Sequence, residues 1–384
     1  MTYLWFKARR AWLRQRLLIL GFLLSLLLLT QRLQRNNSIY MSLNKVIADD
    51  ARRVSSVCSH LFLNKTHNPE PSRGNILLLG SMGRSGSSFL GGLLSSLPGV
   101  FYYFEPFYNF QQWGMHSQAL AVQSLKELYH CNYSGPVYKA IRARGSKSLR
   151  HWSFNSCHSK QACFNIPRLS KICSREPIRL VKTIRTRVSW LLPLLQDQDL
   201  NLHVIHIARD PRASIISNWK AGWNVSPKNL CEGLLEDLQY GPHLREIMPS
   251  RYIAVRYEDV CADPRTVARN ILHFLGYSEI PQSTIKFLDK TTSRNSSPKD
   301  AYSLQRNSTE QQQKWRKYIR DSELHDVENA CSDAIRHLGF NLFGNMNTTR
   351  NMTFPLFNDS FTNTLFSYED CVNVDGSTRD NLLT

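Results

Sequence analysis

The sequence is poor in acidic residues and lacks several motifs that would define a binding chemistry. It has 30 Asp and Glu against 48 Lys and Arg, a formal net charge of +18. No two of its nine cysteines form a C-x-x-C pair, so we expect no metal site. Zinc-finger spacings, RNA-binding signatures and long Lys/Arg tracts are also missing, which argues against nucleic acid. The basic surplus predicts other acidic partners, such as nucleotides, anionic glycans or membrane surfaces.

Acidic residues are absent from the first 30 positions, whereas five basic residues lie there. Leu17–Thr30 carries no charge; it is shorter than the ~20 residues that span a bilayer. However, upstream apolar residues extend it past Arg14 and Arg16, which can snorkel, and no signal-peptide cleavage site follows. Basic residues are more numerous before the run than directly after it, which keeps the N-terminus cytosolic. We expect a cytosolic tail over 1–10, an uncleaved transmembrane signal-anchor over 11–30 and a lumenal body.

Glycosylation sequons and cysteines agree with a lumenal body. In an oxidising lumen most of the nine cysteines would form disulfides, with a connectivity that the sequence does not reveal. Cys58, in a stem over 31–73, is the candidate for an intermolecular disulfide and hence for a homodimer. A heptad-like pattern over 43–61 fits either self-association or packing on the chain's own domain. The nine N-x-[S/T] sequons begin at Asn36, Asn64, Asn132, Asn224, Asn295, Asn307, Asn347, Asn351 and Asn358.

The fold class follows from apolar segments that alternate with helical patterns. Continuously apolar strands separated by helices predict a parallel sheet covered on both faces, an α/β domain with a P-loop-like sheet over 74–343. A polar, cysteine-containing insertion over 111–175 interrupts the alternation. An Asn/Thr-rich C-terminal tail over 344–384 is expected to wrap irregularly or to be partly disordered. The predicted strands are 76–80, 100–104, 179–184, 202–208 and 252–257.

A loop of small residues links the first predicted strand to a helical pattern. Such a loop lets main-chain N–H groups converge on an anion, and the helix N-terminus adds partial positive charge. Arg84 adds a permanent cation. The loop has no Gly-Lys-[Ser/Thr] and so is not the loop of a nucleotide triphosphatase. The alternative is an ordinary turn. The candidate anion-binding residues are Gly83, Arg84, Ser85, Gly86, Ser87 and Ser88.

A second candidate anion site follows the predicted strand 202–208. Arg209 ends this strand, Pro211 suits the first turn of a helix, and Ser217 lies two turns further on. Arg209 and Ser217 can therefore flank one phosphate. The alternative is an ordinary ion pair between Arg209 and Asp210 at a strand end.

These motifs resemble those of the Golgi carbohydrate 6-O-sulfotransferases, which act on galactose, N-acetylglucosamine and N-acetylgalactosamine. Residues 84–89, followed by 101–106, are similar to the family's 5′-phosphosulfate motif, and 209–217 to its 3′-phosphate motif. The similarity covers about residues 75–343. Further segments that fit in family order are 181–185, 255–259 and 302–316.

The resemblance implies a chemistry and a place in the cell. The donor would be 3′-phosphoadenosine 5′-phosphosulfate, and the reaction an in-line transfer of the sulfuryl group to the 6-hydroxyl of a hexose or N-acetylhexosamine in a glycan or glycosaminoglycan chain, without a metal. Arg84 and the 85–88 backbone would stabilise developing charge. Lys182 would supply a second cation, and Glu105 would be the base; alternatively, Glu105 pairs with a nearby Arg. The protein would be a single-pass type II Golgi membrane protein with its catalytic domain in the lumen.

Some positions leave the details open. Arg306 and Trp315 lie in a segment that resembles the family's donor-covering loop, although Trp315 could equally be a core anchor. Asn109 stands where the family has His, and Asn218 where it often has Arg; we expect both on the acceptor side, so the hexose stays undetermined.

Two other functions compete with this prediction. One is a nucleotide-dependent kinase, and the other is a catalytically inactive, membrane-anchored protein that binds anionic glycans. The presence of Arg84, Glu105, Arg209 and Ser217 favours the enzyme over the inactive protein. Because +13 of the net charge lies in residues 31–384, the glycan or proteoglycan acceptor is itself expected to carry sulfate or uronate charge.

Overall fold

The computed structural model of this chain describes residues 74–112, 117–151, 164–292 and 308–358. The predicted signal-anchor and stem, Cys58 and Arg306 lie outside these ranges. Within them, no helix is both long enough and apolar enough to cross a membrane.

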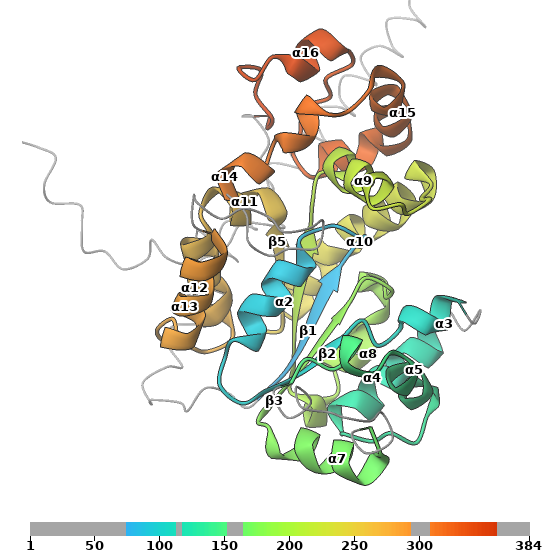
Figure 1. The fold of residues 1–384 in the computed structure, drawn as a ribbon, viewed down its shortest axis with the longest axis vertical. Helices are drawn as coiled ribbons and strands as arrows, with labels where there is room; N and C mark the ends of the chain where they lie inside the picture. Colours follow the sequence, from blue (N-terminus) through green and yellow to red (C-terminus); the bar gives the residue numbers. More distant parts are fainter. Residues whose placement is uncertain (1–73, 113–116, 152–163, 293–307, 359–384) are drawn as a thin grey trace, which may run out of the picture. The chain divides into compact units, whose positions relative to one another are not determined.

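Five parallel strands form one sheet in the order β2-β3-β1-β4-β5 (Figure 1). The five predicted strands are confirmed, each to within one residue at either end. The first strand in the sequence is central, so the chain adds strands first on one side of it and then on the other. In such sheets ligands bind outside the carboxyl end of the strand at which the direction changes. The strands are β1 (Asn75–Gly80), β2 (Val100–Phe104), β3 (Ile178–Thr183), β4 (Leu202–Ala208) and β5 (Tyr252–Arg256).

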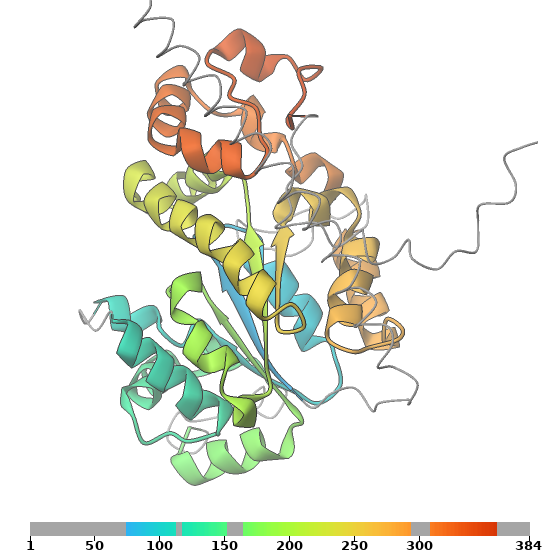
Figure 2. The same ribbon diagram turned by 180° about the vertical axis from the view of Figure 1, so that it is seen from behind.

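Helices cover both faces of the sheet, as the apolar strands predict (Figures 1 and 2). Alternate residues of β1 enter two separate cores: Leu78 packs with α2, α12 and α13, and Leu77 with α4, α8 and α10. The helices are α2 (Ser87–Ser95), α3 (Tyr108–Gln112), α4 (Gln118–Tyr129), α5 (Pro136–Arg144), α7 (Ile166–Arg175), α8 (Leu192–Leu195), α9 (Pro211–Lys220), α10 (Pro227–Ile247), α11 (Tyr257–Ala262), α12 (Pro264–Phe274), α13 (Gln282–Thr292), α14 (Ser308–Gln311), α15 (Asp321–His337) and α16 (Met346–Arg350). The short 3-10 helices are η1 (Gly145–Lys147), η3 (Val188–Trp190), η4 (Gln198–Leu200) and η5 (Lys314–Lys317).

The insertion after β2 is a helical layer that belongs to the domain. Its helices α4 and α5 contribute buried side chains such as Leu128 and Ile141 to the core, so it is more apolar than the sequence suggested. Cys131 and Cys173 form a disulfide within it. After η1 the chain runs antiparallel to the outer edge of β2, where the Phe104 N–H donates to the Ser148 carbonyl at 2.8 Å. The insertion therefore covers an edge that would otherwise be open.

Cysteine pairing also fixes the C-terminal part of the domain. Cys231 of α10 and Cys331 of α15 form a second disulfide, which closes a loop of 100 residues. Most of the described cysteines are thus paired, as expected in an oxidising compartment. The described cysteine without a disulfide is Cys261, which is buried. The odd number of cysteines therefore does not by itself require that Cys58 forms an intermolecular disulfide. The described sequon asparagines, Asn132, Asn224, Asn347, Asn351 and Asn358, are all exposed.

The first part of the predicted tail packs on the domain. The guanidinium of Arg316 donates to the carbonyls of Thr349 at 2.9 Å and Asn351 at 2.6 Å, and to the side chain of Gln313 at 2.5 Å. Phe357 pairs with Phe340 in an antiparallel bridge. The chain therefore wraps irregularly but in a fixed position through Asn358.

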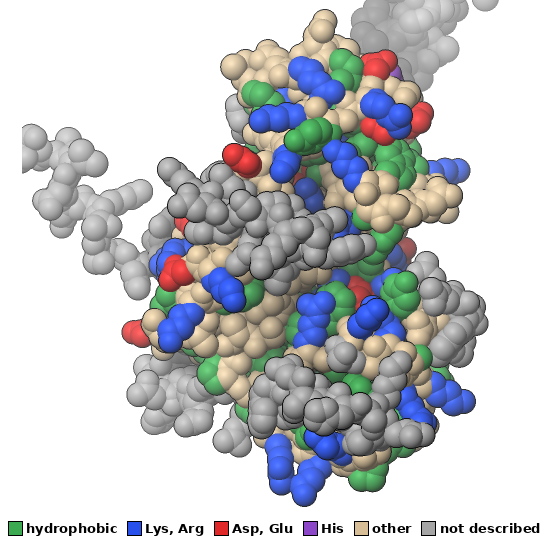
Figure 3. Space-filling view, in the orientation of Figure 1, with side chains coloured by type: hydrophobic (Ala, Val, Ile, Leu, Met, Phe, Trp, Pro, Cys, Tyr) green, Lys and Arg blue, Asp and Glu red, His purple; other side chains and the backbone are tan. Residues whose placement is uncertain are grey.

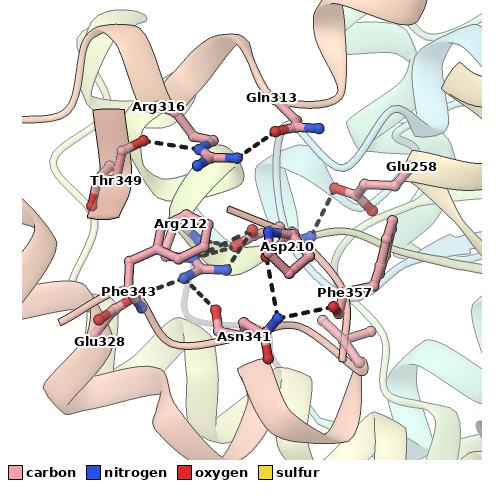
Figure 4. A network of polar contacts seen from close by, with 12 residues as sticks. Asp210, Arg212, Glu258, Gln313, Arg316, Glu328, Asn341, Phe343, Thr349 and Phe357 are labelled. Carbon is pink, nitrogen blue, oxygen red and sulfur yellow. Dashed lines mark hydrogen bonds and ion pairs between the residues drawn. The ribbon is translucent and has the colours of Figure 1, made fainter. Parts of the chain in front are cut away.

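A buried ionic network joins α9 to this C-terminal part (Figure 4). Arg212, which has no exposed surface, bonds Asp210 at 3.0 Å and Glu328 at 2.6 Å. Its guanidinium carbon lies 4.8 Å from the ring centre of Trp315 and 4.5 Å from that of Phe343. Because charge and hydrogen bonds are both satisfied, this arginine is structural.

Replacing Arg212 with Ala tests that role. The change leaves two buried carboxylates without their cation, so we expect the free energy of unfolding to fall by about 3–5 kcal/mol. Urea-induced unfolding of the purified protein measures it. The exposed Arg336→Ala variant on α15 is the control and should lose under about 1 kcal/mol. An equally small loss for Arg212→Ala would contradict the structural role.

Candidate active site

A strand, a loop of small residues and a helix form the predicted anion cradle. The loop leaves β1 at Gly80, and α2 begins at Ser87. Gly86 has φ of 89°, and a Cβ there would lie 2.2 Å from Cδ2 of Tyr257, so only glycine fits. Arg84 also adopts a left-handed backbone, with φ of 63°.

The two predicted anion sites meet at the carboxyl ends of β1 and β4. The Arg84 Nε donates to the Ser217 Oγ at 3.1 Å, and the Arg209 Nη1 donates to the Arg84 carbonyl at 2.8 Å. The Arg209 guanidinium carbon lies 4.2 Å from the ring centre of Tyr257. Two guanidinium groups and a hydroxyl from distant motifs therefore lie close together; that Arg209 and Ser217 flank one phosphate stays a prediction.

Some buried polar atoms here lack a partner, which is a mark of a ligand site. Among the described residues, the Ser85 Oγ and the Arg209 Nε are buried without a hydrogen bond. Buried polar groups are normally satisfied, so orphaned donors beside a helix N-terminus fit an anionic ligand. The oxygens of such a ligand would supply the missing acceptors.

Asn218 belongs to this cradle. Its Nδ2 donates to the Gly83 carbonyl at 3.2 Å and to the Ser214 carbonyl at 3.0 Å. A Cβ on Gly83 would lie 2.7 Å from the Trp223 ring, so the loop is tightly packed on this side. The amide of Asn218 therefore holds the anion-binding loop, and its expected place on the acceptor side stays a prediction.

A buried hydrogen-bond network fixes the start of the anion-binding loop at Ser81. The Ser81 Oγ lies 2.5 Å from the His206 Nε2, whose Nδ1 lies 2.8 Å from the Tyr252 hydroxyl. Burial lowers the pKa of His206 to about 3, so the ring is neutral. Arg187 donates to the Asp237 carboxylate at 2.8 Å and to the Ser81 carbonyl at 3.4 Å. Sequence reasoning missed this network, because its members come from five separate segments.

Glu105 directly follows β2 at the same edge of the sheet. The Lys182 Nζ donates to its Oε1 at 2.5 Å, and Arg185 donates to its Oε2. Burial raises the pKa of Glu105, but the charges of Lys182 and Arg185 outweigh burial and hold the pKa below 4.5. Its φ of 51° is a strained conformation for a residue other than glycine. The ion pair with a nearby Arg, the alternative left open by the sequence, is thus present; whether Glu105 is also the base stays a prediction.

Two more arginines approach Glu105 from the insertion. The Arg144 Nη1 donates to the Glu105 carbonyl at 3.2 Å, and its guanidinium carbon lies 4.1 Å from the Tyr108 ring centre. The Arg150 guanidinium carbon lies 3.7 Å from the Phe104 ring centre. Sequence reasoning missed both, since nothing local marks them. Asn109 is buried beside Tyr108.

Trp315 occupies the core, which was one of the two alternatives. It is 4% exposed and stacks on Phe343 with 5.7 Å between ring centres. The ring is therefore too buried to cover a bound donor. Arg306, the other residue of that predicted loop, lies outside the described residues. Within the described residues, no group of three His, Cys, Asp or Glu could hold a metal ion.

Comparison with known proteins identifies the domain. Residues 75–339 match the model of the sulfotransferase domain. The chain belongs to the sulfotransferase domain family. It is 27% identical over 327 residues to mouse carbohydrate sulfotransferase 3, covering 71% of this chain and 69% of the relative. It is 27% identical over 367 residues to human carbohydrate sulfotransferase 5, covering 79% and 87%. The resemblance to carbohydrate sulfotransferases is confirmed.

Solved structures are more distant from this sulfotransferase. The sulfotransferase domain of the Synechococcus PCC 7002 olefin synthase has a TM-score of 0.41 at 18% identity, covering 69% of this chain and 96% of that one. Mouse sulfotransferase SULT7A1, solved in complex with PAP, has a TM-score of 0.38 at 12% identity, covering 69% and 84%.

Proposed function

We propose that this sulfotransferase transfers the sulfuryl group of 3′-phosphoadenosine 5′-phosphosulfate to the 6-hydroxyl of a hexose or N-acetylhexosamine in a glycan or glycosaminoglycan chain. The observation that carries the proposal is the convergence of Arg84, Arg209 and Ser217 at the sheet edge that also holds Glu105 and Lys182. Similarity to the carbohydrate sulfotransferases supports the sugar acceptor. NMR of a product sulfated on a ring hydroxyl would contradict the 6-O position alone.

Backbone strain supports the assignment of Arg84 and Glu105 to the chemistry. Arg84, Glu105, Cys131 and Asn201 are the described residues other than glycine with positive φ. Such conformations cost on the order of 1–3 kcal/mol and cluster at active sites. Two of the four are therefore the residues that the motifs had marked as catalytic.

Each group of the donor has a candidate partner. Arg209 and Ser217 would bind the 3′-phosphate, and the loop from Gly83 to Ser88, with Arg84, would bind the 5′-phosphosulfate. Lys182 lies on β3, beside Leu78 of the strand that precedes the loop. Fixed N–H groups and cations at this place would stabilise charge that develops on the leaving phosphate and on the sulfuryl oxygens. When bound, the nucleotide would supply the sulfuryl group, and these residues would hold and orient it.

Glu105 would remove the proton of the attacking hydroxyl. The low pKa keeps it ionised and ready to accept a proton, but it also makes the carboxylate a weak base while both cations contact it. Movement of Lys182 towards the donor would weaken that restraint. A primary 6-hydroxyl is the least hindered hydroxyl of a hexose and projects furthest, so it can reach a carboxylate recessed at a sheet edge.

The acceptor is proposed to be anionic, and binding to weaken with salt. Figure 3 shows Lys and Arg side chains spread over the face drawn there, from its top to its bottom, with fewer Asp and Glu side chains among them. No observation favours the catalytically inactive glycan-binding alternative, and the loop without Gly-Lys-[Ser/Thr] does not support a kinase.

The donor site is tested by titration with adenosine 3′,5′-bisphosphate and by three variants. We expect micromolar binding by the wild type. Arg84→Ala and Arg209→Ala should each lower kcat/KM by ~100-fold or more, because each removes a cation that faces donor charge. Ser217→Ala should lose less, since a neutral hydrogen bond is worth ~1 kcal/mol. Lys228→Ala, exposed on α10, is the control. Undetectable binding by the wild type would overturn the function.

The base is tested with Glu105→Gln, which keeps the shape but cannot accept a proton. We expect kcat to fall by ~10²–10⁴-fold while affinity for adenosine 3′,5′-bisphosphate changes only a few-fold. Because the pKa of Glu105 lies below its ordinary value, wild-type kcat/KM should lose activity to Glu105 protonation only below pH 4.5. A loss of stability or donor affinity with little change in kcat would instead show that Glu105 only braces Lys182 and Arg185.

We further propose that the protein is a type II Golgi membrane protein whose catalytic domain is lumenal. The uncharged N-terminal run and the basic residues before it support this, as do the exposed sequons and the disulfides. Endoglycosidase treatment should increase gel mobility, and an N-terminal epitope should be accessible only from the cytosol. A secreted protein that begins near residue 31 as the native form would contradict this topology.

A further inference from the structure

We propose that Arg144 and Arg150 form a subsite for an anionic group, a carboxylate or a sulfate ester, on a sugar next to the one that is sulfated. This subsite rests on the proposed function. It would let the enzyme recognise an acceptor chain by a charge outside the reacting sugar.

The first argument is a surplus of positive charge around a single carboxylate. Glu105 contacts Lys182 and Arg185 through its side chain, and Arg144 through its carbonyl. Arg150 and Lys182 lie over the same ring, that of Phe104, at 3.7 and 4.9 Å from its centre. Three cations therefore contact Glu105, two of them at its carboxylate, and a fourth, Arg150, lies over the ring of the neighbouring Phe104.

Among the described residues, Glu105 is the acidic side chain that pairs with cations of this cluster. In the part of the chain that the structure describes, neither Arg144 nor Arg150 forms an ion pair with Asp or Glu. Arg144 and Arg185 instead share the ring of Tyr108, at 4.1 and 4.9 Å from its centre. Like charges held this close repel each other, and an anion bound between them would relieve the repulsion.

Arg144 and Arg150 also lie at the side of the sheet away from the donor cradle. The donor cradle follows β1, and β3 separates β1 from β2. Arg144 ends α5 and Arg150 follows η1, so both come from the insertion outside the edge strand β2. They approach Glu105 from the side opposite to Arg84 and Arg209. A hydroxyl that reaches Glu105 would bring its neighbouring sugar to this side.

The guanidinium groups of Arg144 and Arg150 are held in place but remain accessible. Arg144 is half-buried, with one bond to a carbonyl and its plane near Tyr108. Arg150 is exposed, and its backbone N–H is fixed by the Tyr102 carbonyl at 3.0 Å. Pre-organised guanidinium groups bind carboxylates and sulfates through paired N–H donors with little loss of entropy.

Matched acceptor pairs test the subsite. One pair is a chondroitin hexasaccharide and its carboxyl-reduced form; the other is an N-acetyllactosamine oligomer with and without a sulfate on the neighbouring sugar. Binding is measured by titration in the presence of adenosine 3′,5′-bisphosphate, and transfer by kcat/KM. We expect the wild type to prefer the charged member of at least one pair by ~10-fold or more, and that pair identifies the anion as carboxylate or sulfate.

Variants then assign the preference to residues. Arg144→Gln with Arg150→Gln should abolish the charged-over-neutral ratio, and the Lys pair should restore part of it. Arg142→Ala, exposed on the same helix, is the matched control and should keep the ratio. The measured quantity is the ratio between charged and neutral acceptors. Arg144 also touches Glu105, and a general loss of activity in its variant would lower both values and leave their ratio unchanged.

Three outcomes would overturn the subsite. The wild type could show no preference in either pair, the Gln variants could retain the preference, or they could lose affinity for adenosine 3′,5′-bisphosphate, which would assign these arginines to the donor. Failure of the wild type to bind that nucleotide at all would instead overturn the proposed function. If the double variant does not fold, the single Arg150→Gln variant, at an exposed position, gives the same comparison.

Discussion

Repulsion between cations at the carboxyl ends of the strands is the constraint that shapes this site. Arg84, Arg209, Lys182 and Arg185 come from three segments, the ends of β1, β4 and β3, that a parallel sheet brings together. The Glu105 carboxylate contacts two of these cations, Lys182 and Arg185, so one negative charge faces two positive ones. An anionic ligand at this place would reduce the remaining repulsion, so we expect ligand binding to stabilise the site.

Other arginines near this site have a structural role. Arg212 and Arg316 are fully buried, and the network around them supplies carboxylates, carbonyls and ring faces (Figure 4). Arg209 has a buried Nε without a partner. Arg212 and Arg316 thus hold α9, α15 and the C-terminal segment together, whereas the free Nε of Arg209, beside the loop, leaves a donor that an anion could accept from. Sequence neighbours in one motif therefore divide into structural and functional members.

The sequence predicted what local pattern encodes and missed what the tertiary fold assembles. Apolar runs gave all five strands, and small residues with a strand before and a helix after gave the cradle. Arg209 and Ser217 were predictable because helix geometry fixes their spacing. Arg144 and Arg150 were not, since their position depends on how the insertion folds over β2. The contact of Asn218 with the loop was not predictable either, because its partner, Gly83, lies 135 residues away.

The contacts of Lys182 tie the two halves of the proposed reaction together. Its ammonium is bound to Glu105 on β2's side, while its strand pairs with β1, which leads into the cradle. Burial lowers the pKa of Lys182 despite the attraction of Glu105, so the charge is held at a cost that a second anion would reduce. If Glu105 is the base, a donor that attracts Lys182 raises the basicity of Glu105 at the moment the sulfuryl group is in place. A site without donor would then hold its carboxylate neutralised by Lys182 and Arg185, and the acceptor hydroxyl would meet an active base only when transfer can follow.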